Sequence, residues 1–259
     1  LNSVMALSRV LMMQARDKLN EKEAGYLEII ERNGKDLLAL INDILDLSKI
    51  ESGRMEVNPK PFALDQTLEN IVQSLMPLAR EKQIELHYDI PADLPHIESD
   101  ENRVSQILQN LLSNAVKFTN AGSIWVSTQV YQERIIVRVE DSGIGIAEKD
   151  LPHIFDQFRQ VDGSPAKRHE GTGLGLAIVL KTARMLGGDI SVQSTPGKGS
   201  IFTLTLPLAW EDKTPVYTSA AGGVPFDVKP WQEAICAQNH EAVISPGEPA
   251  GRPRILLVE

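Results

Sequence analysis

The chain has 259 residues, of which 42% are hydrophobic, and carries a formal net charge of -9 at pH 7. The hydrophobic content is enough for a sizeable core, and the acidic balance argues against a nucleic acid or an anionic membrane as the main partner. A single cysteine, Cys236, excludes an internal disulfide and a cysteine-based zinc cluster. No apolar run approaches the roughly 20 residues of a membrane span. We therefore expect a cytoplasmic segment, cut from a longer protein that could be membrane-anchored upstream.

Residues 1–58 are predicted to form a helical hairpin. In its second helix, seam positions recur in alternating steps of three and four, the heptad spacing of a bundle or coiled coil. These positions are Leu27, Ile30, Gly34, Leu37, Ile41, Ile44 and Ser48. A weaker series, Val4, Leu7 and Leu11, marks the first helix, and residues 17–23 form a polar connection. Because Leu38 and Leu45 widen the apolar stripe, we expect a second copy to complete an antiparallel four-helix bundle. The alternative is that the hairpin packs on the following domain.

Residues 59–209 alternate between helical and strand patterns after two prolines, Pro59 and Pro61. Helices are predicted at 64–82 and 101–118, with another after Gly175, and strands at 86–90, 124–130, 135–140, 190–194 and 202–206. The short turns at 131–134 and 195–200 indicate antiparallel hairpins. We expect an α+β domain, a two-layer α/β sandwich with helices on one face of a mixed sheet. Residues 210–252 lack periodicity and are rich in proline and glycine, which predicts a linker. Residues 253–259 end in an apolar strand.

Four short segments of the second domain contain the candidate functional residues. They read N-L-L-S-N-A-V-K-F-T from Asn110, D-S-G-I-G from Asp141, F-D-Q-F from Phe155 and G-T-G-L-G-L from Gly171. Each segment is a weak signal alone. The last differs from the dinucleotide fingerprint G-x-G-x-x-G. The run P-G-K-G-S at 196–200 is better interpreted as a hairpin turn than as a phosphate-binding P-loop, because glycine follows the lysine.

The first segment places three polar residues on one face of a helix. Asn110, Asn114 and Lys117 are spaced by four and three, while the opposite positions are apolar. A carboxamide oxygen can hold Mg²⁺ that is shared with phosphate oxygens, and lysine supplies a charge for those phosphates. The alternative is a solvated polar stripe or a helix cap.

The two glycine segments are suited to a nucleotide. Asp141 follows an apolar strand, and a buried carboxylate needs a donor such as the exocyclic amine of adenine. Gly143 and Gly145 allow a tight backbone turn beside the base, although a simple turn with a capping aspartate is the alternative. The glycines of 171–175 open a helix, where exposed N–H groups and the helix dipole favour an anion. The polar stretch 159–170 is predicted to be a mobile lid, and its Arg159, Lys167 or Arg168 could touch phosphate, with a solvated loop as the equal alternative for each.

In this order the four segments resemble the N, first glycine, F and second glycine boxes of sensor histidine kinases. The wider resemblance is to the ATPase superfamily of gyrase, MutL and the ninety-kilodalton heat-shock chaperone, and it covers about residues 1–208. It implies a Bergerat-type ATP-binding fold with ATP and Mg²⁺ as cofactors. Asn114 would hold the metal with Asn110, and Asp141 would recognise adenine, with Phe118 against the base. The residues expected at the nucleotide are Asn110, Asn114, Lys117, Phe118, Asp141, Gly143, Gly145, Ile146, Phe158, Arg159, Gly171, Thr172, Gly173, Leu174, Gly175, Leu176 and Thr203.

The resemblance leaves three functions to weigh. Hydrolysing members carry a glutamate one turn before the metal asparagine, and here that position is Asn110, whose amide cannot act as a general base. This favours phosphoryl transfer to a histidine over ATP hydrolysis. The third possibility is a nucleotide-binding dimerisation module with no kinase activity.

The acceptor histidine of the family lies on the first bundle helix. The five histidines of this chain are His87, His96, His153, His169 and His240, and none lies there. Residues 1–4 match the family just after the acceptor, so we expect the acceptor upstream of Leu1. We also expect this segment to be unable to phosphorylate itself. Residues 254–259 resemble the first strand of a receiver, which implies a hybrid kinase, and a buried strand of another kind is the alternative. The expected partners are a second copy and a receiver domain or response regulator, with neither nucleic acid nor membrane contacted by this segment.

Overall fold

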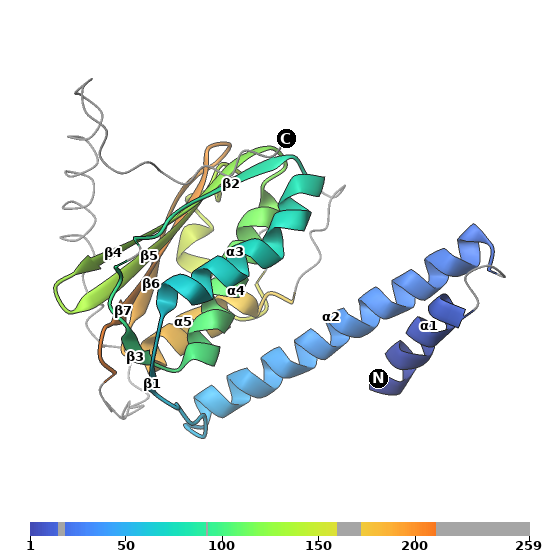
Figure 1. Ribbon diagram of the computed structural model, residues 1–259, viewed down its shortest axis with the longest axis horizontal. Coiled ribbons are helices and arrows are strands. Elements are labelled where there is room, and N and C mark those ends of the chain that lie inside the picture. The colour runs from blue at the N-terminus through green and yellow to red at the C-terminus, as the bar shows by residue number, and fades with distance from the viewer. Residues whose placement is uncertain (15–18, 92, 160–171, 211–259) are drawn as a thin grey trace.

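The structure is a computed structural model that describes residues 1–14, 19–91, 93–159 and 172–210. A helical hairpin is followed by a two-layer α/β domain, in which three helices cover one face of a twisted sheet (Figure 1). The predicted α+β class and two-layer sandwich are confirmed. Among the described residues, no helix is both long enough and apolar enough to span a membrane.

The hairpin consists of α1 (Asn2–Gln14) and α2 (Glu21–Glu51). Asn20 starts α2 with a capping box, because its Oδ1 accepts from Glu23 N at 3.0 Å and its own N–H donates to the Glu23 carboxylate at 2.9 Å. The two helices approach closely where Gly34 faces Met5. A Cβ atom at Gly34 would lie 2.7 Å from Met5 Cγ, which explains why the heptad seam has glycine there. The predicted connection at 17–23 lies partly outside the described residues.

Most of the heptad seam of α2 is exposed in a single chain. Ile30 and Ile41 are 41% exposed, Ile44 is 45% exposed and Leu45 is 51% exposed. The end of the helix is better covered, because Leu47 is buried against Leu174 and Ile178 of the α/β domain and Ile50 is also buried. The alternative interpretation of the apolar stripe was that the hairpin packs on the following domain. Such packing accounts for the burial at one end of α2, but it leaves Ile30, Ile41, Ile44 and Leu45 exposed.

The main sheet has five strands in the order β2-β4-β5-β7-β6. β2 pairs with β4 in parallel, and the other neighbours are antiparallel. The strands are β2 (Ile84–Asp89), β4 (Gly122–Tyr131), β5 (Arg134–Asp141), β6 (Asp189–Thr195) and β7 (Gly199–Pro207). The two hairpins predicted from the sequence, β4–β5 and β6–β7, are confirmed. A small second sheet pairs β1 (Lys60–Phe62) with β3 (Ile97–Ser99), and it was not predicted.

The helices α3 (Leu64–Glu81), α4 (Glu101–Phe118) and α5 (Gly175–Met185) cover the sheet (Figure 1). α4 is the centre of the core, since one of its faces is fully buried: Val104, Ile107, Leu108, Leu111 and Leu112. Its N-cap, Asp100, accepts from Arg103 N at 3.2 Å and from Asn58 N at 3.0 Å. The second bond attaches the chain that leaves the hairpin to the start of α4. A 3₁₀ turn, η1 (Leu151–His153), lies in the connection between β5 and α5.

Candidate nucleotide-binding site

The polar face of α4 carries a paired set of carboxamides. Asn114 Nδ2 donates to Asn110 Oδ1 at 3.0 Å, so one amide holds the other in place. Within the described part of the chain, Asn114 Oδ1 accepts no hydrogen bond. Lys117 Nζ lies 5.2 Å from the centre of the Phe118 ring, a cation–π distance. The face predicted from the spacing is therefore formed, with Asn110 supporting Asn114.

Asp141 ends β5 with a buried side chain that is 7% exposed. Its Oδ1 accepts from Gly143 N at 2.8 Å. Burial raises the pKa of this carboxyl, and hydrogen bonds with the backbone of Gly143 and Ser200 oppose the rise. Among the described residues, no lysine or arginine forms an ion pair with it. A raised pKa with unused acceptor capacity marks Asp141 as a candidate ligand-binding group.

The first glycine segment follows Asp141 and packs tightly between α4 and the β6–β7 turn. A Cβ atom at Gly143 would lie 2.5 Å from Phe118 O, and one at Gly145 would lie 2.1 Å from Thr195 O. Gly145 also has a φ of +67°. Ile146 follows, and its N–H donates to Ser194 Oγ at 2.8 Å. These close approaches require glycine and bring the loop beside Phe118, the predicted adenine neighbour.

The second glycine segment opens α5 against the carboxamide pair. A Cβ atom at Gly175 would lie 2.5 Å from Asn110 Nδ2, so a larger residue would have to displace the Asn110 side chain or move the start of α5 away from α4. Leu174 N donates to Thr172 Oγ1 at 3.2 Å, which ties the first residues of the segment together. Leu174 is fully buried, and Leu176 packs against the main core.

The F box lies beside the second glycine segment. Phe158 N donates to Gly173 O at 3.0 Å. The Phe158 ring is 66% exposed, and Arg159 forms an ion pair with Asp156 at 3.7 Å. Gly171 and the remaining lid cations, Lys167 and Arg168, lie outside the described residues.

One predicted site residue lies on the wrong face of the sheet. In the β5–β7 register Asp141 is opposite Ser200, whereas Thr203 is opposite Arg138. Because side chains alternate along a strand, Ser200 shares the face of Asp141 and Thr203 points to the other face. Thr203 is therefore not brought to the site. Ser200 lies opposite Asp141 instead, and the cross-strand register that places it there cannot be derived from local sequence.

Two family models match the chain. The model described as "Histidine kinase-, DNA gyrase B-, and HSP90-like ATPase" matches residues 99–209, and "His Kinase A (phospho-acceptor) domain" matches residues 1–53. The histidine kinase BarA of Escherichia coli K12 is 39% identical over 208 residues, which cover 78% of this chain and 22% of BarA. The chain belongs to the sensor histidine kinases.

Solved structures of histidine kinases agree with this family assignment. Full-length ShkA in complex with AMPPNP is 32% identical with a TM-score of 0.68, and the match covers 81% of this chain and 43% of ShkA. The catalytic domain of the histidine kinase ThkA is 27% identical with a TM-score of 0.52, covering 60% of this chain and 97% of that domain. The chain thus spans less than half of ShkA and about a fifth of BarA.

The phospho-acceptor match has one notable property in this sensor histidine kinase. Residues 1–53 contain no histidine, although the matching family model is that of a phospho-acceptor domain. The matched segment of the chain therefore holds no residue of the acceptor type.

Proposed function

We propose that residues 59–209 bind Mg·ATP and that the kinase to which they belong transfers the γ-phosphate to a histidine and from there to a receiver aspartate. The observation that supports this most strongly is that the two glycine segments both pack against α4, the helix that carries Asn110 and Asn114. Gly143 packs on the last turn of α4 at Phe118, and Gly175 packs on Asn110 of the same helix. Motifs separated by up to 65 positions in the sequence therefore surround the C-terminal half of one helix.

Asp141 is the proposed adenine-binding residue. Its carboxylate is buried and keeps an acceptor that can take the exocyclic amine of adenine. Guanine has a carbonyl at the corresponding position, which would place an acceptor against a carboxylate. The site is therefore expected to prefer adenine. Ser200, on the same face of the sheet, replaces Thr203 as the proposed neighbour of Asp141.

The carboxamide pair fits a magnesium ion shared with phosphate. Asn114 offers Oδ1 as a hard oxygen ligand, while Asn110 uses its own Oδ1 to hold Asn114. We therefore assign Asn114 as the metal ligand and Asn110 as its support, which narrows the expectation that both bind the ion. Bound Mg²⁺ would neutralise part of the negative charge of the phosphates. Lys117 and the N–H groups at the start of α5 would stabilise the remaining charge.

Phosphoryl transfer is favoured over hydrolysis by the same pair. In the transfer, the bond between the γ-phosphorus and the bridging oxygen breaks as a bond to the acceptor nitrogen forms, and ADP leaves. Hydrolysis would need a base for water next to the metal ligand. Asn110 is an amide, and its oxygen is already hydrogen-bonded to Asn114, so it cannot take a proton.

The chain is expected to bind Mg·ATP without phosphorylating itself. Incubation of residues 1–259 with γ-labelled ATP should leave no acid-labile phosphate on any of the five histidines, while calorimetry detects one nucleotide per chain. The labelling result follows because residues 1–53 contain no histidine. Stable label on His87, His96, His153, His169 or His240 would contradict the assignment.

We also propose that two copies of the chain pair through the hairpin. The uncovered stripe of α2, formed by Ile30, Leu37, Ile41, Ile44 and Leu45, needs an apolar partner, and a symmetric partner is the simplest. A receiver domain or response regulator is the second proposed partner, since the kinase must pass its phosphate on.

Sedimentation of the double variant Leu37→Glu with Ile41→Glu should show a monomer where the unchanged chain shows a dimer. Both side chains are more than 40% exposed in the single chain, so the variant should keep its helical content. Leu78→Glu on α3 is the matched control, because Leu78 is an equally exposed leucine outside the hairpin. A dimer that survives the double substitution would exclude the stripe as the interface.

A further inference from the structure

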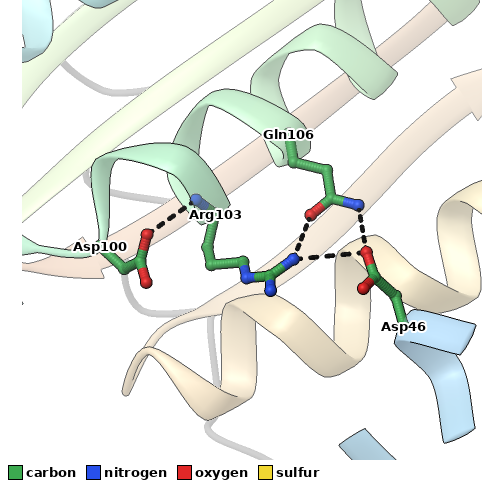
Figure 2. A network of polar contacts seen from close by, with 4 residues as sticks. All are labelled: Asp46, Asp100, Arg103 and Gln106. Atoms are coloured by element: carbon green, nitrogen blue, oxygen red, sulfur yellow. Dashed lines mark hydrogen bonds and ion pairs between the residues drawn. The ribbon is translucent and has the colours of Figure 1, made fainter. Parts of the chain in front are cut away.

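The end of α2 contacts the nucleotide domain through three acidic residues on one side of the helix. Asp43 Oδ2 accepts from Thr172 Oγ1 at 3.2 Å, in the second glycine segment. Asp46 Oδ2 accepts from Gln106 Nε2 at 2.9 Å and from Arg103 Nη1 at 3.3 Å, both on α4 (Figure 2). Glu51 Oε1 accepts from Lys181 Nζ of α5 at 2.6 Å and from Gln157 of the F box at 2.8 Å.

We call this set, Asp43, Asp46 and Glu51, the acidic contact of α2. It reaches the N-box helix, the F box and the second glycine segment at once. Among the elements of the proposed site, only the first glycine segment has no contact with it that the structure describes.

An apolar contact lies between these polar ones. Leu47 of α2 packs with Leu174 and Ile178, and all three are buried, with Leu40 at the edge. Leu174 belongs to the second glycine segment and has no exposed surface. The start of α5 is therefore held against α2 both by apolar burial and by hydrogen bonds. A movement of the second glycine segment would have to break this contact with α2.

The charge at this contact opposes the proposed ligand. Thr172 Oγ1 accepts from Leu174 N and donates to Asp43. The Asp43 carboxylate thus lies one hydroxyl away from the start of α5, the helix end that favours an anion. Burial is the main reason that the pKa of Asp43 is raised, and the neighbouring Asp46 adds to it, while the Thr172 bond opposes the rise. A carboxylate at this place repels a triphosphate and uses the hydroxyl that a phosphate oxygen would otherwise meet.

We propose that docking of α2 through its acidic contact weakens nucleotide binding, so that Mg·ATP and α2 compete for the second glycine segment. The inference rests on the proposed ATP site. Because coupling between two binding events is reciprocal, bound nucleotide must loosen α2 by the same factor by which α2 weakens the nucleotide. The contact therefore links the position of the hairpin to the occupancy of the ATP site.

The test compares Mg·ATP affinity by calorimetry in the chain and three variants. Asp43→Asn should bind at least about 5-fold more tightly, the lower end of typical coupling factors. Leu47→Ala should also bind more tightly, because it loosens α2 without changing any charge. Asp36→Asn is the matched control, since Asp36 is an exposed aspartate on the same helix, and its affinity should equal that of the unchanged chain.

Each outcome decides a different point. Unchanged or weaker binding in Asp43→Asn overturns the inference. Tighter binding in Asp43→Asn with no change in Leu47→Ala also overturns it, because the effect would then be local charge and not docking. Binding by Asp43→Asn alone, with none by the unchanged chain, supports the inference. Absence of binding in every protein, with circular dichroism showing intact folds, refutes the proposed ATP site itself and the inference with it.

Discussion

Replacement of Asp141 by asparagine should weaken Mg·ATP binding by about 10- to 150-fold, because a hydrogen bond to a charged group contributes about 1.5–3 kcal/mol. An asparagine in this position can still accept from Gly143 N through its oxygen. Its NH₂ group would then face the donating amine of adenine. Calorimetry with ATP measures the loss, and an affinity equal to that of the unchanged chain would exclude Asp141 from adenine binding.

The same substitution should leave the fold intact, which separates binding from stability. The pKa of Asp141 is raised in the folded protein, mainly by burial, so the ionised carboxylate costs folding free energy. A carboxyl with a raised folded pKa stabilises the fold fully below its unfolded pKa, and this contribution is lost as pH rises through the folded pKa. Asparagine stays neutral and avoids that loss. Urea unfolding of both proteins between about pH 4 and pH 7 should therefore show that the free energy of unfolding of Asp141→Asn rises relative to that of the unchanged chain as pH rises.

Gly145→Ala should lower the free energy of unfolding more than an alanine substitution at another glycine of similar positive φ, such as Gly197. An L-residue in the left-handed region costs about 1–2 kcal/mol, and overpacking against the Thr195 carbonyl adds about 1–3 kcal/mol. The new Cβ atom would lie 2.1 Å from Thr195 O, so the first glycine segment or the β6–β7 turn must move. Nucleotide affinity should fall with stability because this segment carries the turn after Asp141.

Gly197→Ala provides the control for that collision. Gly197 has a φ of +75°, close to the +67° of Gly145, but a Cβ atom there meets nothing within 4 Å. The control should show only the conformational cost in its free energy of unfolding, measured by urea. Equal losses in the two variants would mean that the contact with Thr195 does not hold the loop.

Periodicity in the sequence was sufficient to predict the elements that make long, regular contacts. The stripe of α4 and the alternation of β4 and β5 each run over enough residues to indicate the element and its buried face. The strands β1 and β3 have three residues each, and Pro61 interrupts the first, so neither shows a pattern. They form because Asp100 and the chain before α3 bring them together.

The candidate site likewise contains residues that local spacing predicts and residues that only long-range contacts bring together. Asn110 and Asn114 are one helical turn apart, so spacing alone places them together. Thr203 was named from the sequence, but Ser200 lies opposite Asp141, because the register between β5 and β7 depends on pairing across 59 positions. The bond between Asp43 and Thr172 joins residues 129 positions apart, and no local pattern predicts it. Contacts of this kind depend on how the hairpin meets the α/β domain.

The most direct measurement of the central claim is a crystal structure of residues 1–259 with Mg²⁺ and a non-hydrolysable ATP analogue. The expected result is adenine bound by its exocyclic amine to the Asp141 carboxylate, the metal on Asn114 Oδ1 and the phosphates at the start of α5. A nucleotide bound elsewhere on the chain, or adenine without contact to Asp141, would contradict the claim that these segments form the ATP site of a histidine kinase.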